Sequence, residues 1–328
     1  GTAINIKLET HNSPRMVEPR GGAATGTGGV LRDINETGLG ARPINSMHMD
    51  FTAAPDINPS LIPPNTLTPT QLLTGSVRGV GGYGNPMGIP TNNGSFHTHP
   101  DYRGKASILV GSMGIMQEKD AQKGSPLHGD LVVAVGGRTG LDGIHGATFS
   151  SESADSTTAT VHSGAVQIGD PIAEKKMFDA VMEASEKGLI RAMTDCGAAG
   201  FASAIGELGE DIGVSVDLAL APLKYSGLQP WEIFLSESQE RGVLAVAPEH
   251  ALEVQAIFAK HSSEATVLGV FGSNGEPTLD VRYGDQQVIE LDYEFIKNGR
   301  INEPLYAEWT PPDVTERLPV VTEWEELL

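Results

Sequence analysis

The chain has 328 residues, 39% of them hydrophobic and 20% charged, so it is long enough for two domains that each bury a core. Its formal net charge of −20 disfavours a nucleic-acid-binding protein, which would carry a basic face. No apolar run is long enough to span a membrane, and the single cysteine, Cys196, excludes an internal disulfide and fits a reducing cytoplasm.

A dense polar motif follows the first predicted strand, which covers residues 3–10. A lysine, a carboxylate, a hydroxyl, an imidazole and an amide occur within six successive positions, and strand alternation directs Lys7, Glu9 and His11 to one side. Few purely structural segments need that mixture. We therefore expect this stretch to bind a phosphorylated substrate, a metal ion and ATP. Because the chain begins with this motif and without methionine, we also expect it to be a piece of a longer protein.

Proline and glycine dominate the next segments. Pro14 and Pro19 are expected to keep the chain extended or turned. Three glycine-rich stretches, 21–29, 79–94 and 136–146, are interpreted as loops that either cradle phosphates or make tight turns. None of them has the spacing of a P-loop or of a dinucleotide-binding fingerprint.

The rest of the chain alternates between strand and helix patterns, which predicts α/β layering. The clearest boundary is Asp170-Pro171, an N-cap followed by proline at the first helical position, in a helix that Gly188 ends. A serine- and threonine-rich loop is expected at 149–163, a hairpin after 276, and an acidic linker at 301–328. Further strands are predicted at 44–51, 106–114, 129–135, 189–193, 214–220, 243–247 and 267–271, and further helices from 70, 201, 230 and 249.

Candidate metal ligands are Glu9, Asp33 and Asp195, because carboxylates from separate loops and strand ends can converge on a hard cation. Each of them alone is equally well explained as a helix cap or an ion-pair partner. His11 could move a proton or polarise a carbonyl, although by itself it fits a hydrogen-bonded turn histidine better. Cys196 has no obvious catalytic neighbour and is interpreted as a small buried hydrophobe.

A series of motifs resembles formylglycinamide ribonucleotide amidotransferase, also called phosphoribosylformylglycinamidine synthase. Any one motif is weakly specific, but together, in order from residue 5 to about 272, they are highly specific. The matching segments are 7–14, 22–33, 81–85, 136–146, 167–171, 194–200 and 236–241.

The resemblance implies the fold of the aminoimidazole ribonucleotide synthase superfamily, an α/β (α+β) fold. It implies a barrel-forming N-terminal domain at 1–122, a C-terminal α/β domain at 123–275, and a hairpin with an acidic linker at 276–328. The implied reaction uses ATP to activate the formamide oxygen of formylglycinamide ribonucleotide as an iminophosphate, which ammonia then displaces.

Residue roles follow from the same resemblance. His11 would be the catalytic acid and base, Lys7 would contact ATP, and Glu9, Asp33 and Asp195 would hold Mg²⁺. The substrate would be contacted by Thr10, His11, Asn12, Ser13, Arg32, Gln167, Glu237, Ser238 and Gln239.

The chain also departs from the family. Ser13 stands where family members commonly have a second histidine, and only the first of two homologous synthetase halves is matched. We expect the family's segment before the motif to be missing from this chain, and the second synthetase half and a glutaminase subunit or domain that supplies ammonia to be its partners. We expect the isolated half to form a homodimer that imitates the pseudo-twofold arrangement of the full enzyme.

Two other functions remain open on these residues. The chain could be a half that binds nucleotide and supports assembly without turnover. It could also be a sister enzyme, such as thiamine-monophosphate kinase or selenophosphate synthetase. The motif at 236–241 argues against both sister enzymes, and the latter would also need a reactive cysteine near its start.

Overall fold

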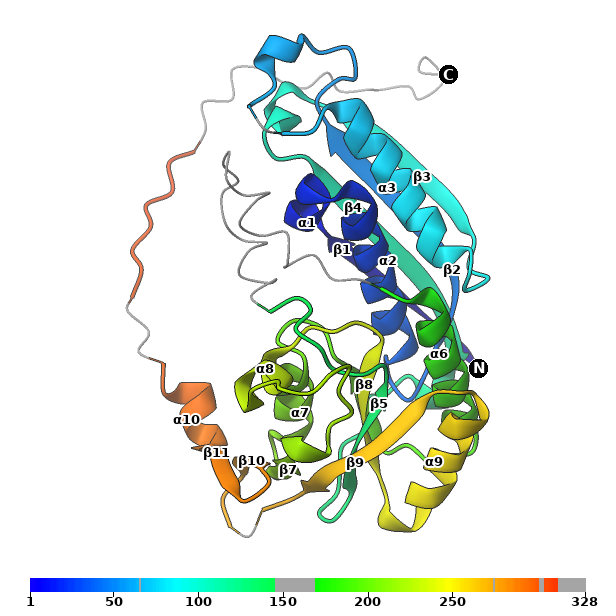
Figure 1. Ribbon diagram of the computed structural model, residues 1–328, viewed down its shortest axis with the longest axis vertical. Coiled ribbons are helices and arrows are strands. Elements are labelled where there is room, and N and C mark those ends of the chain that lie inside the picture. The colour runs from blue at the N-terminus through cyan, green and yellow to red at the C-terminus, as the bar shows by residue number, and fades with distance from the viewer. Residues whose placement is uncertain (65, 145–168, 274, 301–303, 312–328) are drawn as a thin grey trace.

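The structure is a computed structural model that describes residues 1–64, 66–144, 169–273, 275–300 and 304–311. The predicted loop at 149–163 and the candidate Gln167 lie outside the described residues, as do 301–303 and 312–328 of the predicted acidic linker. Two sheets organise the described chain, each covered by helices (Figure 1). The predicted α/β fold class is confirmed.

The N-terminal sheet has four strands in the order β1-β4-β2-β3. β4 pairs antiparallel with β1 and β2, whereas β3 pairs parallel with β2. Helices α2 and α3 lie side by side on one face (Figure 1). The elements are β1 (Thr2–Thr10), α1 (Asn12–Val17), α2 (Pro19–Asn35), β2 (Arg42–Thr52), α3 (Pro69–Gly84), β3 (Thr91–Thr98) and β4 (Ser107–Gln117).

The two prolines and the first glycine-rich stretch do not make a loop; that prediction was wrong. Pro14 and Pro19 each occupy the first turn of a helix, where the missing N–H costs no hydrogen bond. The Glu18 side chain caps α2 by accepting from the backbone N–H of Gly21. The glycines lie inside α2, where they permit close packing. The prediction of a loop at the second glycine-rich stretch, 79–94, was also partly wrong, because the stretch begins in α3 and ends in β3.

The other face of the N-terminal sheet exposes apolar side chains along β1. Ile4, Ile6 and Leu8 are 62%, 60% and 49% exposed, whereas the alternate residues, among them Asn5 and Lys7, face α2. β1 is also an edge strand of the described sheet, since β4 is the one described strand that pairs with it. Within the described residues, this domain therefore presents an unpaired edge beside an uncovered apolar surface.

The C-terminal sheet has seven strands in the order β11-β10-β7-β9-β5-β8-β6. All neighbouring pairs are antiparallel except β10 with β7, so the predicted hairpin is confirmed and extends this sheet. The elements are β5 (Leu131–Gly136), α6 (Pro171–Glu186), β6 (Ala192–Asp195), α7 (Phe201–Gly209), β7 (Val214–Asp217), α8 (Pro230–Leu235), β8 (Arg241–Val246), α9 (Ala251–Lys260), β9 (Glu264–Phe271), β10 (Thr278–Tyr283), β11 (Gln286–Asp292) and α10 (Tyr293–Asn298).

Two helical layers bury the two faces of this sheet. Val132 of β5 belongs to the core cluster that contains Phe201 of α7, whereas the next residue, Val133, belongs to the cluster that contains Met177 of α6. This alternation is the two-residue period of a strand that is buried on both faces. The Asp170-Pro171 helix start is confirmed, with the Asp170 side chain accepting from two backbone N–H groups. β3 and α10 were not predicted.

Among the described residues, none of the helices combines the length and apolar character that crossing a membrane would need.

Candidate functional site

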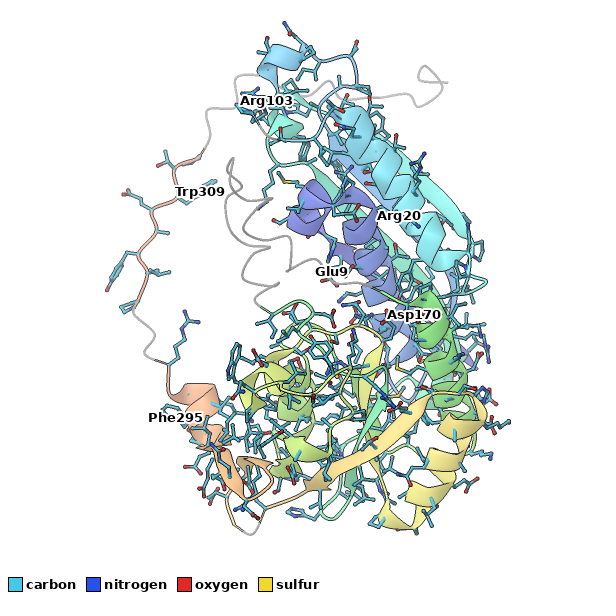
Figure 2. The ribbon with its side chains drawn as sticks, viewed as in Figure 1. Glu9, Arg20, Arg103, Asp170, Phe295 and Trp309 are labelled. Carbon is cyan, nitrogen blue, oxygen red and sulfur yellow. The ribbon has the colours of Figure 1, made fainter. Side chains whose placement is uncertain are left out.

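The polar end of β1 lies against α2. Lys7 Nζ is 3.1 Å from Asp33 Oδ2 and 3.5 Å from Glu9 Oε2. Partial burial acts to lower the pKa of Lys7, but the two carboxylates outweigh it and the net pKa is raised. The predicted strand alternation therefore places Lys7 and Glu9 on the same side of β1, where they meet Asp33 of α2. Figure 2 shows Glu9 in the region between the two sheets.

His11 lies in the turn between β1 and α1. Its backbone N–H donates to the carbonyl of Ile108 at 3.0 Å, and its buried Nε2 has no hydrogen-bond partner in the part of the chain that the structure describes. Burial lowers the pKa of His11 to about 4. The imidazole is therefore neutral at neutral pH, with an open nitrogen available to accept or donate one proton.

A glycine of α2 makes room for His11. A Cβ at Gly26 would lie 2.9 Å from His11 Cβ, closer than real Cβ atoms approach, and 3.1 Å from Val110 Cγ2, which is a tight contact. We expect Gly26→Ala to displace His11 and to destabilise the fold by about 1–3 kcal/mol, the usual cost of overpacking. Gly29→Ala, in the same helix but with open space around it, is the control and should be neutral or slightly stabilising. Chemical denaturation of both variants measures the difference; equal stabilities would contradict this close packing.

Arg32 of α2 is the buried centre of the site. Its Nη1 donates to Gln239 Oε1 at 2.8 Å and to Glu174 Oε2 at 3.1 Å, and its Nε lies 3.7 Å from Asp195 Oδ2. Burial opposes the charge, but the surrounding carboxylates raise the pKa of Arg32, so the guanidinium stays charged. Nε makes no hydrogen bond to the described residues. Arg32, Asp195 and Gln239, predicted from distant segments, are thus brought together.

Segment 236–240, which precedes β8, contains the other predicted substrate contacts, and hydrogen bonds fix it in place. The Ser238 hydroxyl accepts from the backbone N–H of Gly140 at 2.9 Å and donates to the Asp142 carboxylate. Glu237 Oε1 accepts from the backbone N–H of Ala199 at 3.2 Å. The fully buried Arg241 fastens this segment by donating to the carbonyls of Ser236 and Ser238, with its guanidinium 4.5 Å above the Phe201 ring. The third glycine-rich stretch does run as a loop from Gly136 to residue 144, and Asp142 belongs to it.

Asp195 ends β6 and faces the carboxylates of the other domain. Burial, together with the neighbouring Asp33 and Glu9, outweighs the opposing effect of Arg32 and Lys7 and raises the pKa of Asp195 to about 6. As the side chains stand in the described ranges, no three His, Cys, Asp or Glu groups form a metal-ligand cluster, and the Lys7 ammonium pairs with both Glu9 and Asp33. Three hard oxygen donors that repel one another nevertheless match the donor chemistry that Mg²⁺ requires.

The remaining candidates are close in sequence to His11. Thr10 ends β1 and is exposed, Asn12 opens α1 and accepts from the Ser107 hydroxyl, and Ser13 is buried. Cys196 is fully buried, and burial raises the pKa of its thiol to about 12, so its interpretation as a small hydrophobe is confirmed.

Sequence reasoning missed three side chains behind Arg32. Glu174 of α6, Tyr83 of α3 and Glu240 form a buried hydrogen-bonded group. Tyr83 and Glu240 fell inside matched motifs without being given a role. Glu174 resembles an ordinary acid in the first turn of a helix, and only its complete burial distinguishes it.

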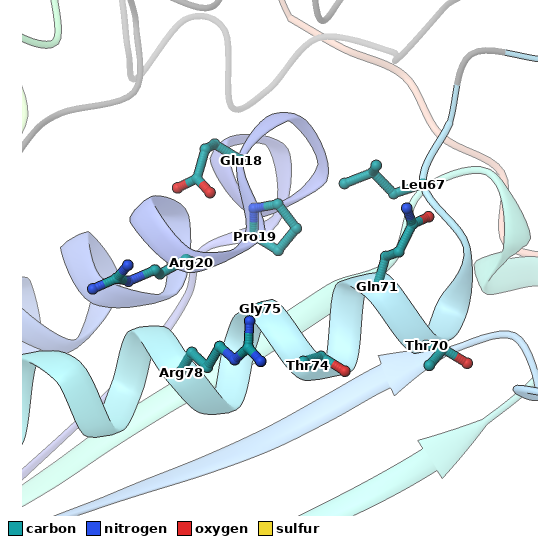
Figure 3. A pocket seen from close by; sticks show the side chains of 9 residues that line it. All are labelled: Glu18, Pro19, Arg20, Leu67, Thr70, Gln71, Thr74, Gly75 and Arg78. Atoms are coloured by element: carbon teal, nitrogen blue, oxygen red, sulfur yellow. The ribbon is translucent and has the colours of Figure 1, made fainter.

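A cavity of about 460 Å³ lies elsewhere, between the N-terminal halves of α2 and α3 (Figure 3). Arg20, Arg78 and Gln71 are among its lining residues, and none of the predicted site residues lines it. It is therefore separate from the group around Arg32.

Comparison with known proteins agrees with this architecture. Residues 1–116 match the N-terminal domain of AIR synthase related proteins, and residues 128–282 match the C-terminal domain. Phosphoribosylformylglycinamidine synthase subunit PurL of Methanopyrus kandleri is 39% identical over 300 residues, which is 90% of this chain and 40% of that protein. The corresponding subunit of Nitrobacter hamburgensis is 36% identical over 346 residues, which is 100% of this chain and 44% of that protein.

Solved structures give the same result. PurL of Thermotoga maritima complexed with FGAR superposes with a TM-score of 0.80 at 31% identity, covering 97% of this chain and 49% of that chain. The same protein complexed with ATP gives a TM-score of 0.77 at 30% identity, covering 97% of this chain and 48% of that chain. The chain thus spans less than half the length of each of these four proteins and structures. With both domains matched in order, the chain belongs to the family of AIR synthase related proteins.

Proposed function

We propose that this chain is the first half of an ATP-dependent phosphoribosylformylglycinamidine synthase. The reaction converts formylglycinamide ribonucleotide into formylglycinamidine ribonucleotide in purine biosynthesis, with ammonia derived from glutamine. The observation that carries the proposal is the site itself: His11 Nε2 and Arg32 Nε are both buried and both without a hydrogen-bond partner among the described residues. Buried polar atoms are normally paired, so a ligand that supplies the missing partners is expected here.

The side chains suggest a division of roles. Arg32 and Gln239 are fixed against each other and would hold the polar part of the ribonucleotide, together with Glu237 and Ser238. The substrate-contact assignments of Thr10, Asn12, Ser13 and Gln167 rest on the family resemblance. His11, neutral and with an open Nε2, would take the proton from the attacking ammonia once the formamide carbon is activated.

Mg²⁺ and ATP would bind at the polar end of β1. Glu9, Asp33 and Asp195 are the residues that would hold Mg²⁺, and Lys7 would contact ATP. The ion would neutralise phosphate charge, which is the main requirement of phosphoryl transfer. With the ion bound, the Lys7 ammonium would be released from Glu9 and Asp33 toward a phosphate.

The chain spans only 40% and 44% of the two synthase subunits compared above, which supports a second synthetase half, whereas the glutaminase rests on the family resemblance. We propose that a second synthetase half and a glutaminase complete the enzyme in the cytoplasm. We also propose domain limits at 1–122 and 123–275, with the hairpin after 276 attached to the second domain through β10. A sister enzyme of the superfamily is disfavoured, because the two relatives described above, at 39% and 36% identity, are both synthase subunits.

The outer face and the edge of β1 are exposed among the described residues. We propose that, in the isolated chain, a second copy occupies them. The chain should sediment as a dimer, and Ile6→Glu should sediment as a monomer, because it places a charge in the centre of the apolar surface. Leu252→Glu is the control, because that residue is 81% exposed on α9, in the other domain. A wild-type chain that stays monomeric at high concentration would rule out the dimer.

One experiment separates an active half from a half that only binds. The chain is titrated with ATP–Mg²⁺ and formylglycinamide ribonucleotide in a calorimeter, and ADP release is then measured with added ammonia. Ammonia-dependent ADP release that is lost in His11→Ala supports the enzyme. Binding without ADP release supports the alternative, a non-catalytic binding and assembly half. Absence of both would reject the proposed function.

A further inference from the structure

The buried group behind Arg32 contains fewer hydrogens than its contacts require. Tyr83 Oη lies 2.6 Å from Glu174 Oε2 and 2.7 Å from Glu240 Oε1. A phenol has one hydrogen and can donate it to only one of these oxygens. If both carboxyls were ionised, the other contact would join two lone pairs at hydrogen-bonding distance in a buried site, which is strongly repulsive.

We propose that Glu174, Tyr83 and Glu240 share one additional proton at neutral pH, and that this proton preserves the positive charge of Arg32 for an anionic substrate. One carboxyl then donates to Tyr83, and Tyr83 donates to the other. The shared proton itself is independent of the roles assigned above, whereas its effect on substrate binding by Arg32 rests on the proposed function. Glu174, Tyr83 and Glu240 act here as positioning residues, because Arg32 stands between them and the substrate.

Two glycines leave the space that the Tyr83 side chain occupies. A Cβ at Gly28 of α2 would lie 2.6 Å from Tyr83 Cζ, and a Cβ at Gly169 would lie 2.6 Å from Tyr83 Cε2. Two glycines from different domains therefore allow Tyr83 to extend from α3 to the carboxyls of the C-terminal domain. Glu240 also has a positive φ of 58°, which is unusual for a residue with a side chain.

The charges around the group explain what the proton does. Glu174 accepts from Arg32, Glu240 accepts from the backbone N–H of Asp170 at 2.9 Å, and Asp195 lies on the far side of Arg32. The buried Glu36, whose carboxyl oxygens have no hydrogen-bond partner in the described chain, also interacts electrostatically with Glu174, which raises the pKa of Glu36. With the shared proton, Arg32 is balanced by one negative charge from Glu174 and Glu240. Without it, the same two carboxyls carry two.

Electrostatics agree with this proton count. Burial, together with the neighbouring Glu240, raises the pKa of Glu174 to about 8, and burial also raises the pKa of Glu240. An acid whose pKa is raised in the folded state binds more protons there than in the unfolded chain. Folding stability should therefore fall as pH rises from about 4.5 to about 8, and level off above that.

The test compares the wild-type chain with Glu174→Gln, which is permanently neutral and keeps the shape of the protonated acid. Urea midpoints are measured between pH 5 and pH 9, with Glu186→Gln, an exposed acid on the same helix, as the control. We expect the wild-type midpoint to fall relative to Glu174→Gln up to about pH 8, whereas the control keeps the wild-type slope. Parallel wild-type and Glu174→Gln curves would overturn the shared proton, whether or not the chain binds substrate.

Ligand binding tests the second part of the proposal, that the shared proton preserves the positive charge of Arg32 for the substrate. The affinity for formylglycinamide ribonucleotide should fall about tenfold between pH 7 and pH 9 in the wild type, and much less in Glu174→Gln. An equal fall in both proteins would overturn the link to Arg32. No binding at any pH, combined with the expected urea result, would reject the proposed function while leaving the shared proton in place. Should Glu174→Gln fail to fold, infrared spectroscopy decides the proton count. The carbonyl band of a protonated carboxyl should be present in the wild type at pH 7 and absent in Glu240→Gln.

Discussion

Replacement of Arg32 by alanine is expected to lower the free energy of unfolding by about 3–5 kcal/mol, because it leaves buried carboxylates without their cation. The guanidinium contacts Glu174, Gln239 and Asp195, from three separate segments of the C-terminal domain. It is therefore the main polar link between that domain and α2. The loss should appear as a lower urea midpoint in the absence of any ligand.

Two further variants show whether the loss comes from unpaired charge. Arg20→Ala changes an exposed arginine of the same helix, which has no ion pair among the described residues, and should alter stability by no more than about 0.5 kcal/mol. Adding Glu174→Gln to Arg32→Ala should restore part of the loss, since one unpaired carboxyl is removed. If Arg32→Ala and Arg20→Ala were equally mild, the buried network would not stabilise the fold.

Alanine at Gly200 is expected to disrupt the segment 236–241. Gly200 has a positive φ of 55°, and a Cβ there would overlap the carbonyl oxygen of Ser236 and lie 3.1 Å from Arg241 Nη2. Neither backbone can move freely, because Arg241 itself donates to the Ser236 carbonyl. Strain and overpacking together should cost roughly 3 kcal/mol or more.

Gly206→Ala is the matched control for this change. Gly206 lies in the following helix, α7, with no atom near the position of a new Cβ. Alanine there should be neutral or stabilise by up to about 1 kcal/mol, because it raises helix propensity. The two proteins are compared by thermal unfolding and by binding of formylglycinamide ribonucleotide. Equal behaviour of the two variants would show that segment 236–241 tolerates displacement.

Local patterns predicted the C-terminal domain well. The Asp170-Pro171 boundary depends on capping chemistry within a few residues, and the apolar run 131–135 in the predicted strand at 129–135 indicates its burial directly. The predicted strand at 214–220 was too long, because β7 ends at Asp217 and a 3-10 turn follows. These features need no knowledge of distant contacts.

The N-terminal domain was harder, because its glycines serve tertiary packing. In isolation, 21–29 has the composition of a loop, yet Gly26 and Gly28 lie in α2 where His11 and Tyr83 approach the helix closely. Only the folded arrangement reveals that reason. The same holds for Glu174, whose role depends on Arg32, a residue 142 positions away in the sequence.

The site was predicted as a set of residues but not as a geometry. Arg32, Asp195 and Gln239 lie together, whereas Glu9 and Asp33 pair with Lys7 in the described structure. Sequence proximity placed Lys7 beside Glu9, but it could not show that the lysine would lie between two candidate metal ligands. The spacing of the carboxylates depends on how α2 packs against β1.

Calorimetric titration of formylglycinamide ribonucleotide into the chain tests the central claim most directly. We expect the wild-type chain to bind the ribonucleotide, and Gln239→Ala to bind it at least about tenfold more weakly, since a buried hydrogen bond to the charged Arg32 is lost. Wild-type binding that Gln239→Ala leaves unchanged, or a wild-type chain that does not bind the ribonucleotide, would contradict the proposed site.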